Sequence, residues 1–101
     1  TMLKRKKTLE ITENTVLQRD QEQEYTYLDG EVVMLSLKTG SYYGLDTVGT
    51  RIWELLDKPI RFSSLVDKLM EEFEVTREEC EEDTRDYLRD LYEIHLLKEV
   101  G

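Results

Sequence analysis

The chain has 101 residues, of which 39% are hydrophobic and 37% are charged, and its formal net charge is −9. This length suits one small domain, and no apolar run approaches the roughly 20 residues that a membrane-spanning helix needs. With one cysteine, Cys80, and one histidine, His95, the chain has neither an internal disulfide nor a closed zinc site of these ligands. We therefore expect a small, reduced, cytoplasmic domain that works by binding, with no cofactor and no metal.

The charge is unevenly distributed along the chain. Four of the 14 basic residues lie at positions 4–7, which leaves 10 basic against 23 acidic residues in the remainder. Because affinity for nucleic acid depends largely on basic charge, we expect neither nucleic acid nor an anionic membrane as a partner. Residues 1–14 are interpreted as a flexible basic N-terminal segment, and residues 15–101 as the folded domain.

Residues 25–45 predict a three-stranded antiparallel meander. Asp29-Gly30 separates two β-rich runs, 25–28 and 31–37. This dipeptide is typical of a type I′ hairpin turn, whose two central residues both need a positive φ. A three-residue loop at 38–40, with Gly40 in the left-handed conformation, then returns the chain as a strand over 41–45.

These two turns predict the register of the sheet and therefore its faces. The first hairpin places Thr26 opposite Val33. The second places Leu37 opposite Ser41, Leu35 opposite Tyr43, and Val33 opposite Leu45. The face assigned to the core holds Leu28, Val33, Leu35, Leu37, Tyr43 and Leu45. The other, mixed and aromatic face holds Tyr25, Tyr27, Val32, Met34 and Tyr42.

After residue 46 the apolar spacing becomes helical and predicts three helices. Glu79 follows a threonine by three residues, which is typical of a capping box, and the apolar tail 96–100 is expected to cover the core. Since strands precede helices, the predicted fold class is α+β and winged-helix-like, a three-stranded antiparallel sheet followed by three helices (β-β-β-α-α-α). The expected helix N-caps are Asp46, Ser63 or Ser64, and Thr76.

No pattern in the chain predicts catalysis. Cys80 and His95 lie fifteen residues apart on one predicted helix, about 22 Å at 1.5 Å per residue, so they cannot form a dyad. The acidic residues around Cys80 also disfavour its thiolate. The acidic run 71–90 is interpreted as a solvated helix face, with a site for a cation or a basic peptide as the alternative. We expect that the chain is not an enzyme.

The last strand of the meander is an unprotected edge. Residues 41–45 contain neither proline nor charge, and such an edge can pair with another strand. An edge beside an amphipathic helix can accept a peptide, with backbone bonds giving affinity and pockets giving selectivity. The alternatives are an edge covered by the N-terminal segment and a homodimer formed edge to edge.

Three stretches carry a resemblance to a known family: Leu-Asp-Gly-Glu-Val-Val-Met-Leu at 28–35, Thr-Gly-Ser-Tyr-Tyr-Gly-Leu-Asp at 39–46, and Gly-Thr-Arg-Ile-Trp-Glu-Leu-Leu at 49–56. Over about residues 15–100 the chain resembles PqqD-like proteins, and most closely the stand-alone PqqD-family chaperones of lasso peptide biosynthesis. This resemblance implies that 15–101 is a peptide recognition domain for ribosomally made, post-translationally modified peptides (RiPPs).

The resemblance also implies a ligand, a partner and a site. The ligand is the leader segment of a precursor peptide, and the partner is a separate leader peptidase of cysteine-protease type. The leader is expected to add to the strand 41–45 and lie against the third helix, with Tyr87 as a pocket wall and Asp83 near a positive leader residue. The expected peptide-binding residues are Ser41, Tyr42, Tyr43, Gly44, Leu45, Cys80, Asp83, Thr84, Tyr87, Leu88 and Leu91.

The function expected from sequence is therefore a non-catalytic adaptor that binds a leader and presents it to the peptidase. One alternative is a PQQ-pathway precursor chaperone, which would bind a different precursor. The alternative from another class is a winged-helix regulatory domain, whose DNA binding would weaken steeply with salt. A homodimer through the same edge would compete with the leader.

Overall fold

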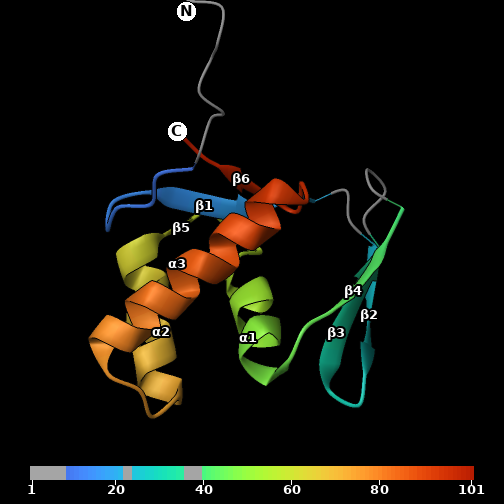
Figure 1. Ribbon diagram of the computed structural model, residues 1–101, viewed down its shortest axis with the longest axis horizontal. Coiled ribbons are helices and arrows are strands. Elements are labelled where there is room, and N and C mark those ends of the chain that lie inside the picture. The colour runs from blue at the N-terminus through green and yellow to red at the C-terminus, as the bar shows by residue number, and fades with distance from the viewer. Residues whose placement is uncertain (1–8, 22–23, 36–39) are drawn as a thin grey trace, which may run out of the picture.

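The computed structural model describes residues 9–21, 24–35 and 40–101, and within them two antiparallel sheets and three helices (Figure 1). The predicted α+β class, with a three-stranded sheet followed by three helices, is confirmed. The sequence did not predict the second sheet. In chain order the elements are β1 (Val16–Arg19), β2 (Glu24–Leu28), β3 (Glu31–Leu35), β4 (Tyr42–Gly44), α1 (Thr47–Leu55), β5 (Ile60–Arg61), α2 (Phe62–Glu72), α3 (Arg77–Glu93) and β6 (Leu97–Glu99).

The unpredicted sheet has the strand order β5-β1-β6 and joins segments that are far apart in sequence. Leu17, in the central strand β1, faces Ile60 of β5 on one side and Glu99 of β6 on the other, and is fully buried. In Figure 1 this sheet lies across one end of the three helices. The C-terminal tail covers the core as predicted, but it does so as a strand of this sheet, with Leu97 only 5% exposed.

The other sheet, in the order β2-β3-β4, is the predicted meander. Asp29 and Gly30 have φ angles of 52° and 83°, which confirms the turn with two positive φ values. Thr26 faces Val33, which confirms the register of the first hairpin. Gly40 has the predicted positive φ, at 71°.

The predicted register between β3 and β4 is wrong by one residue. Met34 faces Tyr43 and Val33 faces Gly44, instead of the predicted pairs of Leu35 with Tyr43 and Val33 with Leu45. The predicted pair of Leu37 with Ser41 lies outside the described residues. A shift of one residue exchanges the two faces of a strand, so the error matters for the core.

The predicted core face of this sheet is also wrong for β2 and β3. Val32 and Met34 are fully buried, whereas Leu28 is 62% exposed. The buried side is the aromatic face, because the Tyr25 ring packs edge-on against the buried Trp53 of α1, with 6.0 Å between ring centroids. Tyr43 and Leu45 pack on the core side as expected.

Two of the three predicted helix caps are confirmed. The Asp46 carboxylate accepts from the Gly49 N–H at 2.7 Å, and the Thr76 hydroxyl accepts from the Glu79 N–H at 3.2 Å. The predicted serine cap of the second helix is wrong, because α2 begins at Phe62 without a side-chain cap. There the N–H groups of residues 62 and 63 donate to carbonyls of residues 15 and 13, so neighbouring backbone replaces the cap.

Part of the predicted N-terminal segment packs along α3. Leu9 and Ile11 are each 5% exposed. The guanidinium groups of Arg85 and Arg89 donate to the Ile11 and Leu9 carbonyls at 3.0 and 3.4 Å. Residues 1–8 lie outside the described part, and the division of the chain at residue 15 stays a prediction.

Candidate functional site

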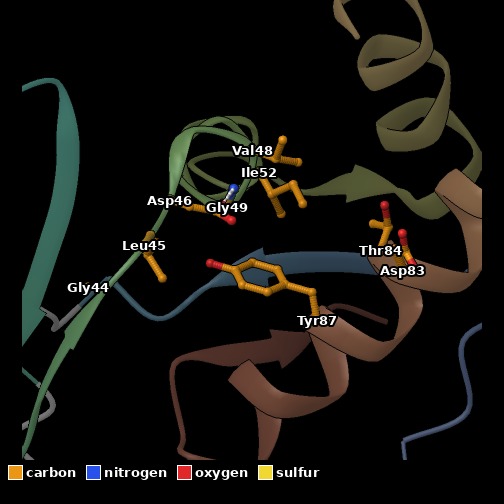
Figure 2. A pocket seen from close by; sticks show the side chains of 9 residues that line it. All are labelled: Gly44, Leu45, Asp46, Val48, Gly49, Ile52, Asp83, Thr84 and Tyr87. Carbon is orange, nitrogen blue, oxygen red and sulfur yellow. Dashed lines mark hydrogen bonds between the residues drawn. The ribbon is translucent and has the colours of Figure 1, made fainter. Parts of the chain in front are cut away.

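A cavity of about 490 Å³ lies between the end of β4, the beginning of α1 and the first half of α3 (Figure 2). We name it the β4–α3 groove. Side chains from α1 and α3 face each other across it, and β4 runs into one end. Its lining consists of Gly44, Leu45, Asp46, Val48, Gly49, Ile52, Asp83, Thr84 and Tyr87.

The start of α1 is fixed beside β4 by a short connection and by Thr50. The Leu45 N–H donates to the Val32 carbonyl at 2.8 Å, which continues the β3–β4 ladder to the edge of the helix. The buried Thr50 hydroxyl accepts from the Val32 N–H at 2.9 Å and donates to the Leu45 carbonyl at 3.3 Å. The first turn of α1 is therefore held against the sheet and forms one wall of the groove.

The opposite wall comes from one face of α3. Thr84 and Tyr87 are three residues apart and so share this face, and the Tyr87 ring points across the groove toward α1 (Figure 2). A Cβ atom at Gly49 would lie 2.6 Å from the Tyr87 hydroxyl oxygen. With the ring in this position only a glycine fits at residue 49, so the Tyr87 hydroxyl lies directly against the first turn of α1.

The Tyr87 hydroxyl is buried and has no hydrogen-bond partner among the described residues. Burial, and secondarily the nearby Asp46 carboxylate, raise the pKa of Tyr87 well above its ordinary value. A buried donor without an acceptor costs about 1–3 kcal/mol. The free protein therefore keeps a polar group at this wall in an unfavourable state.

The groove is apolar along its length and acidic at its two ends. Leu45, Val48 and Ile52 supply apolar wall, and the exposed Asp46 and Asp83 lie at opposite ends (Figure 2). None of the residues that line it is lysine or arginine. This lining suits apolar side chains and hydrogen-bond donors, and it disfavours anions.

The outer edge of β4 runs into the groove. Successive residues of a strand direct their backbone N–H and C=O groups to opposite sides. The Leu45 N–H points toward β3, so the backbone groups of Tyr42 and Gly44 point away from β3. No strand of the described ranges pairs with this side of β4. An incoming peptide could therefore hydrogen-bond to the edge while its side chains enter the groove.

Eleven residues were predicted to bind a peptide, and the structure brings five of them together around the groove. These are Gly44, Leu45, Asp83, Thr84 and Tyr87. Peptide contact by these residues stays a prediction.

The other six predicted residues lie outside the lining of the groove. Tyr42 is 75% exposed on the face of the sheet that points away from the core, Tyr43 packs against the core, and Ser41 is exposed before β4. The remaining three are buried core residues of α3: Cys80, Leu88 and Leu91.

Sequence reasoning missed the contribution of α1 to this site. From sequence, Asp46 is expected only as a cap, and the apolar spacing that includes Val48 and Ile52 predicts only a helix. The short connection between strand and helix could have predicted this contribution. A helix separated from an edge strand by only two residues must place its first turn beside that edge. Val48 is in fact 41% exposed and lines the groove.

Cys80 and His95, the two residues weighed for catalysis, lie at different places in the fold. The Cys80 sulfur is buried, and its contact is the Thr84 hydroxyl at 3.9 Å. His95 lies beyond the C-terminal end of α3, with a φ of 66°. Histidine, cysteine and acidic side chains in the described ranges form no group suited to a metal ion, and none of the helices there has the length and apolarity of a transmembrane segment.

Comparison with known proteins identifies the family of this fold. The family model described as Coenzyme PQQ synthesis protein D (PqqD) matches residues 31–97, a range that includes β3, β4 and all three helices. The chain belongs to the PqqD family. No curated protein sequence matches it.

Two solved structures share the fold. TbiB1 in complex with the TbiA(beta) leader peptide matches with a TM-score of 0.74 and 40% identity, over 83% of this chain and 98% of TbiB1. A lasso peptide synthetase B1 complexed with the leader peptide matches with a TM-score of 0.71 and 22% identity, over 81% of this chain and 96% of that protein. The second match is similar in fold alone.

Proposed function

We propose that this PqqD-family protein is a non-catalytic adaptor of lasso peptide biosynthesis. It binds the leader segment of a ribosomal precursor peptide by strand addition to β4, and it presents the leader to a separate leader peptidase of cysteine-protease type. The observation that carries the proposal is the open β4 edge beside the apolar β4–α3 groove. The leader peptide bound to TbiB1, which is 40% identical, supports the class of ligand. The adaptor acts in the cytoplasm, where precursors are translated.

The energetics of such binding are favourable. A strand of about five residues makes four or five backbone hydrogen bonds, each contributing about 1 kcal/mol net. One or two buried apolar anchors add roughly 1.5–3 kcal/mol each, and ordering a disordered leader costs about 2–5 kcal/mol. The balance reaches at most about 9 kcal/mol, so a dissociation constant near or below micromolar requires two anchors that fill the groove, since backbone bonds alone give much weaker binding.

Presentation to a peptidase is supported by the outer face of the β2-β3-β4 sheet. Leu28 and Tyr42 are 62% and 75% exposed there, and the half-buried Val33 and Leu35 lie on the same face of β3. Contiguous exposed apolar surface marks interaction sites. A leader added to β4 would widen this face by one strand, so a peptidase docked on it would contact adaptor and leader together.

Leader binding is tested by a titration of the fluorescein-labelled TbiA(beta) leader peptide, the ligand of the 40% identical TbiB1, followed by fluorescence anisotropy. We expect saturable binding that a scrambled leader does not reproduce and that changes little with salt. A steep loss with salt on a DNA probe would instead indicate the regulatory-domain alternative. A PQQ-pathway precursor in the same assay tests the other alternative within the family, and a folded protein that binds neither precursor contradicts the proposal.

Presentation is tested separately with Leu28→Ser. This substitution changes the outer face and leaves the groove intact, so we expect unchanged leader affinity and slower removal of the leader by the peptidase. Lys58→Ser is the matched surface control. Lys58 is exposed, lies outside the groove and belongs to neither β2, β3 nor β4. Equal rates of leader removal for both variants would contradict docking on this face.

Light scattering with and without leader tests whether an edge-to-edge homodimer competes for β4.

A further inference from the structure

The Tyr87 hydroxyl in the wall of the β4–α3 groove is buried and has no hydrogen-bond partner within the described part of the chain. Buried polar groups are nearly always hydrogen-bonded, and each exception requires an explanation. The hydroxyl rests against Gly49, beside the Asp46 carboxylate, which already accepts from the Gly49 N–H at 2.7 Å. Tyr87 therefore has a donor that no described residue uses.

A peptide strand added to β4 would bring the complementary unsatisfied group. Successive residues of a strand direct their backbone groups to opposite sides. Every second leader residue would bond to β4, and the residues between them would direct a carbonyl and an N–H toward α3. A carbonyl on this second edge that packs against α3 out of contact with water needs a protein donor.

The lining of the groove offers few donors for that carbonyl. Asp46 and Asp83 have only acceptors when ionised, which suits the N–H groups of the same edge. Thr84 is a helical residue only 3% exposed, and its hydroxyl lies 3.9 Å from the Cys80 sulfur. Among the side chains that line the groove, Tyr87 is the one that extends across it and carries a hydroxyl donor without an acceptor among the described residues.

We infer that Tyr87 is a leader-binding residue whose hydroxyl donates to a backbone carbonyl on the leader edge that faces α3. This inference rests on the proposed function. The bound leader draws the hydroxyl off Gly49 and exchanges an unsatisfied donor for a hydrogen bond. The groove then recognises the leader backbone along both edges, through β4 on one side and Tyr87 on the other.

Tyr87→Phe tests the inference, because it removes the donor and keeps the ring. We expect affinity for the labelled leader to fall roughly fivefold, as the loss of one net hydrogen bond predicts. The melting temperature should stay equal or rise, since the variant no longer buries an unsatisfied hydroxyl. Tyr92→Phe is the matched control, because Tyr92 is a half-buried tyrosine of α3 outside the groove.

Thioamide substitution along the leader locates the partner carbonyl. A thioamide keeps the N–H but weakens the carbonyl as an acceptor, so one position facing α3 should lose affinity in the wild type and lose nothing in Tyr87→Phe. In a double-mutant cycle, we therefore expect the thioamide at that position and Tyr87→Phe to be non-additive in their effects on affinity. Leader affinity within twofold of wild type in Tyr87→Phe, or a loss that no thioamide position shares, would overturn the inference while leaving the adaptor role intact. A wild-type protein that binds no leader would overturn both.

Discussion

The two sheets of this protein each have three strands and differ in how deeply they are buried, and we call β5-β1-β6 the closed sheet and β2-β3-β4 the open sheet. In the β5-β1-β6 sheet the central strand has partners on both sides, its neighbours are two and three residues long, and Leu17 is fully buried. In the β2-β3-β4 sheet every residue of β2 is exposed, and the side of β4 away from β3 faces the groove. Hence the β5-β1-β6 sheet contributes to the buried core, and the β2-β3-β4 sheet exposes one edge strand to solvent and the other to the groove.

This difference shows how a chain of 101 residues combines a stable core with an open binding edge. The closed sheet joins both ends of the domain by backbone bonds, from Asp20 to Leu96 at 3.0 Å and from Val100 to Val16 at 2.8 Å. The open sheet is attached mainly through contacts to α1. The four variants below test this contrast in order of decreasing expected effect.

Leu17→Ala should produce the largest loss of stability. Leu17 is fully buried in the closed sheet, and such a truncation costs about 3 kcal/mol from lost transfer energy and the cavity that remains. Leu28→Ala, the same change in the open sheet at 62% exposure, should cost less than about 0.5 kcal/mol. Urea denaturation measures both, and equal losses would contradict the assignment of the two sheets.

Arg19→Met should produce the second largest loss, because this side chain joins the two sheets. Its guanidinium lies about 5 Å from the Tyr25 and Trp53 rings, and it donates to the Trp53 carbonyl, the Tyr25 hydroxyl and the Asp57 carboxylate at 3.1, 3.2 and 2.8 Å. Losing these contacts should cost about 2 kcal/mol in the free energy of unfolding. Arg61→Met, at an exposed arginine, is the control, and a loss no larger than in this control would refute the bridging role.

Local signals explain which parts of the fold were predictable. The Asp29-Gly30 turn, the Asp46 cap and the Thr76 cap each depend on residues within three or four positions, and all three are confirmed. The β5-β1-β6 sheet depends on pairing between segments some 40 and 80 residues apart, and its strands are too short to show a pattern.

The inner face of the open sheet could not be chosen from sequence, because both faces are apolar. What decides it is a non-local contact, the packing of Tyr25 on Trp53. The site was predictable to the extent that it depends on the edge strand and on the α3 face, which supply Gly44, Leu45 and Tyr87. The α1 wall was not, since Val48 and Ile52 fit a buried stripe equally well.

Gly49→Ala should have a moderate effect centred on the groove. The new Cβ would lie 2.6 Å from the Tyr87 hydroxyl oxygen and 3.1 Å from an Asp46 carboxylate oxygen. We expect about 1 kcal/mol lower stability, although alanine favours the helix by up to about 1 kcal/mol, and severalfold weaker leader binding. Gly44→Ala is the stability control, because its Cβ meets no atom within 4 Å. Combining Gly49→Ala with Tyr87→Phe should recover part of the lost stability, and strict additivity would contradict the contact.

Glu54→Gln should have the smallest effect, because it changes only exposed contacts, a bond from Tyr27 that holds the open sheet against α1 and an ion pair with Arg51 at 3.5 Å. The Tyr27 hydroxyl donates to Glu54 at 2.6 Å, and this bond to a carboxylate raises the pKa of Tyr27. Because the pKa of Tyr27 is higher in the folded protein, this bond contributes fully to the free energy of unfolding below the ordinary tyrosine pKa near 10. The contribution is lost as pH rises through the pKa of Tyr27 in the folded state. Absorbance at 295 nm, with Tyr27→Phe to assign the signal, should show ionisation at lower pH in Glu54→Gln than in wild type. Identical curves would mean that the Tyr27–Glu54 bond does not form in solution, which would leave the packing of Tyr25 on Trp53 and the Arg19 bridge as the attachments of the open sheet.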